Sequence, residues 1–166
     1  MIRSGALSVV VPVFNNAQTV ATLWERLRAV LGAEAEVVFV DDRSPDDASQ
    51  RIRALLDRDP RLVLVRMGEN VGQNRAVLVG FAVAQGAWVV NLDADLQDPP
   101  EAIPELLNAA QRQGADVVFA GRRGRYQSSA RLLTSRLYKR TLSLATGVPP
   151  DAGIFAAVSR PVIDRI

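Results

Sequence analysis

Two carboxylates, Asp93 and Asp95, stand two positions apart directly after an apolar run at residues 88–92. A short apolar run of this kind indicates a buried strand that ends where the acids begin. On an extended backbone the two side chains point the same way, and their like charges repel unless a cation joins them. Gln97 would add a neutral oxygen ligand, so the pattern predicts a Mg²⁺ or Mn²⁺ site that holds phosphate oxygens. The alternative is a simple turn before a helix, for which residues 98–101 suffice.

A second pair of acids, Asp41 and Asp42, follows another apolar run at residues 37–40. An acid at the end of a buried strand can accept hydrogen bonds from a nucleobase or a ribose. The alternative is that the acids serve the next helix, predicted over residues 45–57 with Ser44 as its N-cap and Pro45 at its first position. Capping does not need Asp41 or Asp42, so we expect them to bind a ligand.

Several classes of enzyme are disfavoured by what the chain lacks. It has no histidine and no cysteine, which removes imidazole catalysis, disulfides and thiolate metal sites. It also lacks both glycine motifs that cradle phosphates, G-x-x-x-x-G-K-[ST] and G-x-G-x-x-G after a strand. Phosphates would instead meet a metal and the guanidinium groups of Arg75, Arg122 and Arg123. Catalysis is left to carboxylates, arginines, hydroxyls, amides and a bound metal.

Positive charge is concentrated in residues 122–140, which carry +7 with no acid among them, in a chain whose net charge is only +2. This asymmetry predicts an anionic partner, which could be a phosphate, a lipid head group or a nucleic acid. A helix expected at about residues 130–145 is amphipathic, so it could lie on anionic lipid. The alternatives are a packed helix with a basic outer surface and a solvated basic face.

The elements that must position these groups alternate between strands and helices. We expect strands at 7–13, 37–40, 62–66, 88–92 and 116–120, and helices at 17–31, 45–57, 73–85, 100–113 and 130–145, then a short strand and the beginning of a helix within 154–166. Such alternation predicts an α/β fold, a mostly parallel sheet sandwiched by helices, in one domain spanning residues 1–166. Ligands bind such sheets at the carboxyl ends of the strands, where the acids fall. No stretch approaches the roughly 18 apolar residues of a membrane span, and no secretory signal precedes the first strand.

Six segments together resemble the family 2 glycosyltransferases of the GT-A fold (nucleotide-diphospho-sugar transferases, Rossmann-like). The resemblance is to the polyprenyl-phosphate branch, which includes dolichyl-phosphate mannose synthase, and it covers nearly the whole chain. The most specific segment is Asp-Ala-Asp-Leu-Gln-Asp-Pro-Pro-Glu at 93–101, because this extended form marks the lipid-phosphate branch. The other segments lie at 10–15, 39–46, 69–73, 133–138 and 150–153.

The resemblance implies a metal-dependent enzyme that moves a hexose from a UDP- or GDP-linked sugar to a polyprenyl phosphate, with Mg²⁺ or Mn²⁺ as cofactor. It implies catalytic roles for Asp93, Asp95 and Asp151. The donor nucleotide would contact Pro12, Phe14, Asn16, Asp41, Asp42, Asn70, Gly72, Arg75 and Asp93. The acceptor phosphate would contact Arg122, Arg123, Arg131, Ser135 and Arg136. We expect a peripheral position on the cytoplasmic face of the cell membrane, an anionic membrane surface as partner and no nucleic acid, and leave a homo-oligomer open.

Departures from the family pattern support an alternative. The family usually has Glu where this chain has Asn16, and it usually has an acid and an Arg where this chain has Ile154 and Ala156. These differences favour a catalytically impaired domain that still binds a nucleotide sugar. A nucleotidyltransferase would need a glycine-rich loop after the first strand, and residues 14–16 offer none. Family members also continue into juxtamembrane or transmembrane helices, so we expect the chain to be truncated before them.

Overall fold

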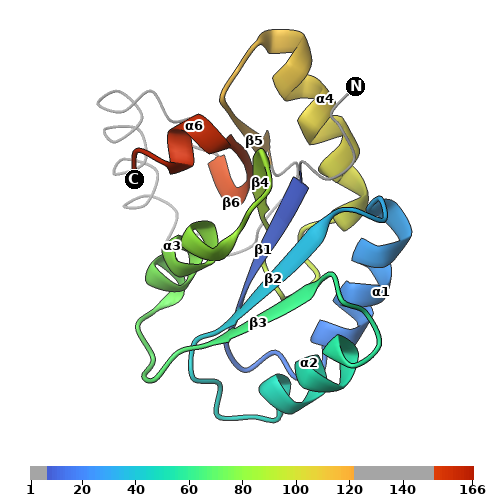
Figure 1. Ribbon diagram of the computed structural model, residues 1–166, viewed down its shortest axis with the longest axis vertical. Helices are drawn as coiled ribbons and strands as arrows, with labels where there is room; N and C mark the ends of the chain where they lie inside the picture. The colour runs from blue at the N-terminus through green and yellow to red at the C-terminus, as the bar shows by residue number, and fades with distance from the viewer. Residues whose placement is uncertain (1–6, 122–151) are drawn as a thin grey trace, which may run out of the picture.

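A six-stranded sheet forms the centre of the molecule in the computed structural model, which describes residues 7–121 and 152–166 (Figure 1). The strands are β1 (Leu7–Val13), β2 (Glu36–Asp41), β3 (Leu62–Arg66), β4 (Trp88–Asn91), β5 (Val117–Gly121) and β6 (Ala152–Ser159). The helices are α1 (Val20–Val30), α2 (Ala48–Leu56), α3 (Gln73–Val83), the 3₁₀ turn η1 (Pro100–Ala102), α4 (Ile103–Gln113) and α6 (Arg160–Ile163).

The strands lie in the order β3-β2-β1-β4-β6-β5. β1 pairs in parallel with both β2 and β4, and β2 pairs in parallel with β3. β6 runs antiparallel between β4 and β5. The carboxyl ends of β1 to β4 therefore meet at one edge of the sheet, and the turns that leave them are neighbours in space.

Helices cover both faces of the sheet, as expected for strands that are apolar on both sides. α1, α2 and α4 cover one face, where the core includes Val9, Val11, Phe39 and Phe155, all at most 2% exposed. α3 and α6 cover the other face, where the alternate residues of the same strands, including Val10, pack. α3 lies so close to the sheet that a Cβ on its Gly80 would come within 2.3 Å of Val10 Cγ1, so only glycine fits there.

The predicted α/β fold, with a mostly parallel sheet between helices, is confirmed. The first and third strands have the predicted bounds, and the other described elements differ from expectation by a few residues at one or both ends. The predicted helix at 130–145 lies outside the described residues.

The start of the second helix was predicted wrongly. α2 begins at Ala48 rather than at Pro45, and Ser44 does not cap it. The Ser44 hydroxyl instead accepts a hydrogen bond from Asn15 N at 3.2 Å, so it joins the turn after β1 to the turn after β2. Asp46 receives the Ala48 N–H and also the Ala17 N–H, at 3.2 and 2.8 Å. The residues predicted to begin the second helix therefore connect the turns that follow β1 and β2.

Candidate functional site

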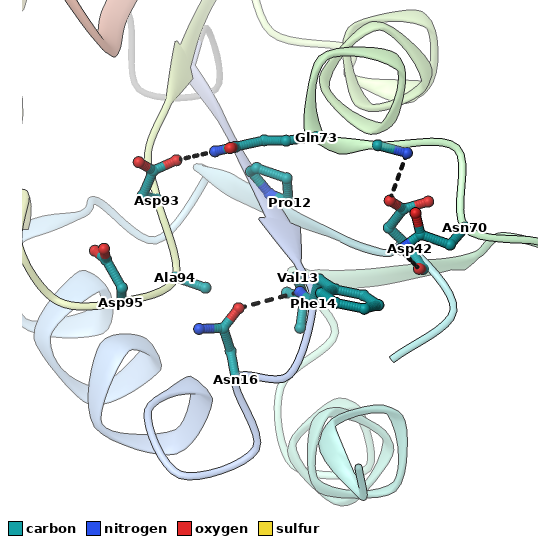
Figure 2. A pocket seen from close by; sticks show the side chains of 11 residues that line it. Pro12, Val13, Phe14, Asn16, Asp42, Asn70, Gln73, Asp93, Ala94 and Asp95 are labelled. Atoms are coloured by element: carbon teal, nitrogen blue, oxygen red, sulfur yellow. Dashed lines mark hydrogen bonds between the residues drawn. The ribbon is translucent and has the colours of Figure 1, made fainter. Parts of the chain in front are cut away.

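A pocket of about 480 Å³ opens at the carboxyl ends of β1 to β4. Its lining comes from four turns that are far apart in the sequence (Figure 2). The lining residues are Pro12, Val13, Phe14, Asn16, Asp42, Asn70, Gly72, Gln73, Asp93, Ala94 and Asp95. The parallel strand order explains why these turns meet, because each strand delivers its carboxyl end to the same edge.

Most of the residues predicted to bind the donor nucleotide and the metal line this pocket. From the donor set these are Pro12, Phe14, Asn16, Asp42, Asn70, Gly72 and Asp93, and Asp95 joins them. The structure does not bring Asp41, Arg75 or Gln97 into the lining, and the side chains of Arg75 and Gln97 are exposed. Asp151 and the predicted acceptor residues Arg122, Arg123, Arg131, Ser135 and Arg136 lie outside the described residues.

Asp42 lines the pocket beside the turn that precedes α3 and is only 3% exposed. Its carboxylate accepts a hydrogen bond from Val71 N at 2.7 Å on one oxygen and from Gly72 N at 2.8 Å on the other. Asn70 Nδ2 donates to the Asp42 backbone carbonyl at 3.1 Å. The acid therefore holds the turn between β3 and α3 against the end of β2, and it plays no part in capping α2.

Gly72 gives this turn a backbone conformation that other residues rarely adopt, with φ 87° and ψ 153°. This region is essentially restricted to glycine, since a Cβ there strains the backbone. No atom lies within 4 Å of where a Cβ on Gly72 would stand, so the restriction comes from the backbone alone. The conformation turns the chain into α3 with Gln73 as its first residue.

Asp93 and Asp95 line the opposite side of the pocket, with Ala94 between them (Figure 2). Asp93 Oδ1 accepts a hydrogen bond from Gln73 Nε2 at 2.5 Å. Asp95 Oδ1 accepts one from the Gln97 backbone N–H at 3.0 Å, which tightens the turn that follows β4. The next residue, Leu96, has a positive φ of 65°, so the chain leaves the extended conformation at this point.

Phe14 and Asn16 form the wall contributed by the turn after β1. Asn16 Oδ1 accepts the Phe14 N–H at 3.0 Å, and the intervening Asn15 has a φ of 58° (Figure 2). Phe14 is 50% exposed, whereas most large apolar side chains in the described part of the chain are buried or half-buried. An aromatic face beside polar groups suits the stacking of a planar ring. Asn16 is neutral, so this wall carries no charge of its own.

Asp41 lies behind the pocket and is 1% exposed. Its carboxylate accepts hydrogen bonds from Ser44 N at 2.9 Å and from the Ser49 hydroxyl, and Arg66 Nε stands 3.6 Å away. These contacts join the end of β2 to α2 and β3. The geometry therefore gives Asp41 a structural role, in contrast to its neighbour Asp42.

Folding stability should fall below about pH 5, because the pKa of Asp41 is lowered in the folded chain. Burial alone would raise this pKa, but hydrogen bonds and the nearby charge outweigh burial and hold it below the ordinary value of 3.8. A carboxylate with a lowered folded-state pKa stabilises the fold above its unfolded-state pKa and loses that contribution as pH falls through the folded value. Hydrogen bonds from Arg61 and Arg26 also lower the pKa values of Asp59 and Glu101, so these acids act in the same direction.

The measurement is the urea midpoint of unfolding between pH 7 and pH 2.5. We expect a plateau above about pH 5 and a steep fall below it. Asp41→Asn should lower the plateau and flatten the fall. An equally steep fall in the variant would assign acid sensitivity to other groups.

Gln73 is the functional candidate that sequence reasoning missed, along with the lining positions Val13 and Ala94. A signal was present, since Gln73 directly follows Gly72 at the predicted beginning of a helix, beside the strand ends. Its contact with Asp93, a residue 20 positions later in the chain, could not be predicted from the sequence.

The two carboxylate ligands offered by Asp93 and Asp95 fit a divalent metal that also binds a phosphate. No group of three or more histidine, cysteine or acidic side chains suited to a metal occurs within the described residues. Two carboxylates do not make a complete cage, but Mg²⁺ is usually held by one or two carboxylates plus substrate phosphates. Both side chains open on the same pocket, which has room for such a substrate. The predicted ligand Gln97 does not line the pocket, and its backbone N–H donates to Asp95 Oδ1.

Helices long and apolar enough to cross a membrane are absent from residues 7–121 and 152–166.

Comparison with known proteins places this geometry in a family. The family model for glycosyl transferase family 2 matches residues 8–166. An undecaprenyl-phosphate 4-deoxy-4-formamido-L-arabinose transferase of Aeromonas hydrophila is 41% identical over 166 residues, which cover 96% of this chain and 51% of that protein. The protein of that name from Pseudomonas syringae is 38% identical over 96% of this chain and 49% of its own length. The chain thus spans about half the length of these relatives.

Solved structures agree on the fold. A mannosyltransferase from Pyrobaculum calidifontis, in complex with GDP-Man and Mn²⁺, superimposes with a TM-score of 0.71 at 23% identity, over 96% of this chain and 46% of that one. Glucosyl-3-phosphoglycerate synthase from Mycobacterium tuberculosis, in complex with Mn²⁺, UDP and phosphoglyceric acid, gives 0.71 at 22% identity, over 95% and 56%. The likeness shows the GT-A fold, and the family model covers almost every residue. The chain belongs to glycosyl transferase family 2.

Proposed function

We propose that this chain carries the donor-binding and catalytic region of a glycosyltransferase that moves a sugar from a nucleoside diphosphate to a polyprenyl phosphate. The observation that carries the proposal is the pocket itself. It brings a buried acid, Asp42, and an exposed aromatic ring, Phe14, together with the Asp93 and Asp95 carboxylates. The names of relatives at about 40% identity support the choice of acceptor.

The arrangement suits a nucleoside diphosphate that lies across the pocket. The base would stack on Phe14 and reach Asp42, whose carboxylate oxygens each keep a second lone pair beside the N–H bonds they accept. The diphosphate would then lie toward Asp93 and Asp95 on the other side. These two acids would repel a diphosphate unless a cation lay between them, which is why we include Mg²⁺ or Mn²⁺ in the proposal.

The chemistry requires little from general bases. An acceptor phosphate is already ionised at neutral pH, so a chain without histidine can catalyse its attack. The step that needs help is the departure of the nucleoside diphosphate, whose negative charge the bound metal would neutralise. The chain's own residues bind and orient the donor. Asp151 and the basic residues of 122–140 remain predictions for the acceptor side.

The sugar stays open between two classes. The resemblance implied a hexose, whereas the relatives' names contain an arabinose derivative, which is a pentose. We propose a sugar on UDP or GDP and test both classes. A binding panel by calorimetry would use UDP- and GDP-linked hexoses and pentoses, each with Mn²⁺ and with EDTA, followed by transfer to undecaprenyl phosphate. Absence of binding to every member with Mn²⁺ would reject the proposal.

A catalytically impaired domain is the second candidate, and Asn16 is the observation that favours it. Its neutral amide in the pocket stands where the family usually has an acid, and its Oδ1 is used by the Phe14 N–H. Nucleotide-sugar binding without any transfer to the lipid acceptor would select this candidate. Asn16→Glu would then be expected to restore transfer, whereas Asn16→Gln would not.

Vesicle binding should depend on the basic residues of 122–140. Each Lys or Arg near an anionic surface contributes about 1 kcal/mol, so the +7 segment would hold the chain loosely on anionic lipid and release it in salt. The triple change Arg131→Gln, Arg136→Gln and Arg140→Gln should abolish co-sedimentation with anionic vesicles while nucleotide affinity stays the same. If the unmutated chain ignores anionic vesicles at low salt, the peripheral membrane position loses its support.

A further inference from the structure

A chain of hydrogen bonds joins the two acidic sides of the pocket through three consecutive residues. Asp42 receives the N–H groups of Val71 and Gly72. The next residue, Gln73, reaches across to Asp93 (Figure 2). The strands that precede the two acids, β2 and β4, lie on either side of β1 and do not pair with each other. The turn from Val71 to Gln73 is thus a direct connection between the nucleotide side and the proposed metal side.

We propose that Gln73 is a positioning residue for Asp93. In this proposal Asp42 places the Gln73 side chain within hydrogen-bonding distance of Asp93, because it holds the turn at Val71 and Gly72. The metal-binding part of this inference rests on the proposed function, since it takes Asp93 as a metal ligand. Gln73 donates to Oδ1 of Asp93 and so restricts the rotation of the carboxylate, and this bond uses one of the roughly four lone-pair sites that an ionised carboxylate offers. It also offsets part of the repulsion from Asp95 without adding a charge of its own.

The geometry of the turn supports this coupling. Gly72 adopts a backbone conformation essentially restricted to glycine, and this conformation sets the direction in which α3 begins. A buried carboxylate holding two successive N–H groups is a strong, charge-assisted anchor. Gln73 itself is exposed, so its side chain would be free to rotate without the contact to Asp93, and its packing does not explain its orientation.

Partners that orient a metal ligand typically change metal affinity by 10- to 100-fold when they are removed. Gln73→Leu keeps the approximate size of the side chain and removes its donor. We therefore expect this variant to bind Mn²⁺ roughly 10-fold more weakly in the absence of nucleotide. Asn74→Leu is the matched control, because Asn74 is the exposed neighbour on the same helix turn and does not line the pocket.

The role of Asp42 is tested in the same metal titration, still without nucleotide, so that no direct contact with a ligand can intervene. Asp42→Asn should also weaken Mn²⁺ binding, and the double variant with Gln73→Leu should bind no more weakly than Gln73→Leu alone. Gly72→Ala provides a second way to disturb the turn without altering any carboxylate, and it should behave as Asp42→Asn does. Circular dichroism establishes that each variant remains folded.

Electron paramagnetic resonance of free Mn²⁺ gives the affinities, and the side-chain amide signal of Gln73 in proton–nitrogen NMR spectra reports its contact without any metal. The signal should shift in Asp93→Asn and in Gly72→Ala but not in Asn74→Leu. Affinity of Gln73→Leu within about twofold of the unmutated chain, or additive losses in the double variant, would overturn the inference. Should the unmutated chain bind no Mn²⁺, the metal part of the proposed function fails, and an unshifted Gln73 signal in both variants would overturn the positioning role separately.

Discussion

Asp95→Ala should abolish most of the metal-dependent affinity for a nucleoside diphosphate while the chain remains folded. Removing one partner of a close charge pair costs about 3 kcal/mol, which corresponds to a loss of roughly 100-fold in affinity. Within residues 7–121 and 152–166, Asp95 accepts a hydrogen bond from the Gln97 N–H in an exposed turn, so the loss of stability should be small. The measurement is calorimetric titration with UDP and GDP in the presence of Mn²⁺ and of EDTA.

The control for this variant is Asp57→Ala, which removes the same charge from an exposed position at the end of α2. That helix end points toward the opposite edge of the sheet, and Asp57 does not line the pocket. We expect Asp57→Ala to bind both nucleotides as the unmutated chain does. Equal affinity of the unmutated chain in EDTA and in Mn²⁺ would remove the metal from the proposed mechanism.

Asp42→Asn should weaken nucleotide binding about 10-fold and also lower the free energy of unfolding. In the unmutated chain the Asp42 carboxylate accepts the N–H groups of Val71 and Gly72. Asn keeps one oxygen acceptor, but its NH₂ group would face the other of these two N–H groups. A buried donor left unsatisfied costs about 1–3 kcal/mol. A sequence-based view of Asp42 as a pure ligand contact predicts no such loss, so the stability term is specific to the structure.

The neighbouring substitution Asp41→Asn provides the comparison. Asp41 is buried as deeply but does not line the pocket, and its partners are Ser44, Ser49 and Arg66. We expect Asp41→Asn to lower the melting temperature while nucleotide affinity changes less than twofold. If both variants lose nucleotide affinity to the same extent, the distinction that the geometry draws between the two acids is incorrect.

Apolar periodicity and strand–helix alternation were enough to predict the architecture. The central strands β1, β2 and β4 are apolar runs buried on both faces, and helices such as α1 and α4 have an apolar stripe that packs on the sheet, so the signal is local and strong. The same reasoning predicted that the acids at residues 42, 93 and 95 would meet, because parallel strands present their carboxyl ends at one edge. These conclusions need only the order of the elements.

Other features depended on which atoms meet once the sheet is assembled. Asp41 and Asp42 are adjacent and chemically identical, yet one serves the interior and the other faces the pocket, since successive side chains along an extended strand point to opposite sides. Ser44 resembles a helix cap in sequence, but its hydroxyl receives the N–H of Asn15, a residue from another turn. A local sequence pattern cannot show whether a side chain will bond to a helix backbone within four residues or to a backbone group that is distant in the sequence and comes near only in the folded chain.

Gln73 is the clearest case of a residue whose hydrogen-bond partner could not be predicted from the sequence. Its sequence context indicates only a polar residue at the beginning of a helix, and the side chain that it contacts lies 20 positions away. That contact exists because β4 is placed beside β1 and the turn before α3 is clamped by Asp42. The chemistry of the individual groups was therefore encoded in residue types and spacing, while their pairing was decided by tertiary structure, because pairing requires distances that only the assembled sheet defines.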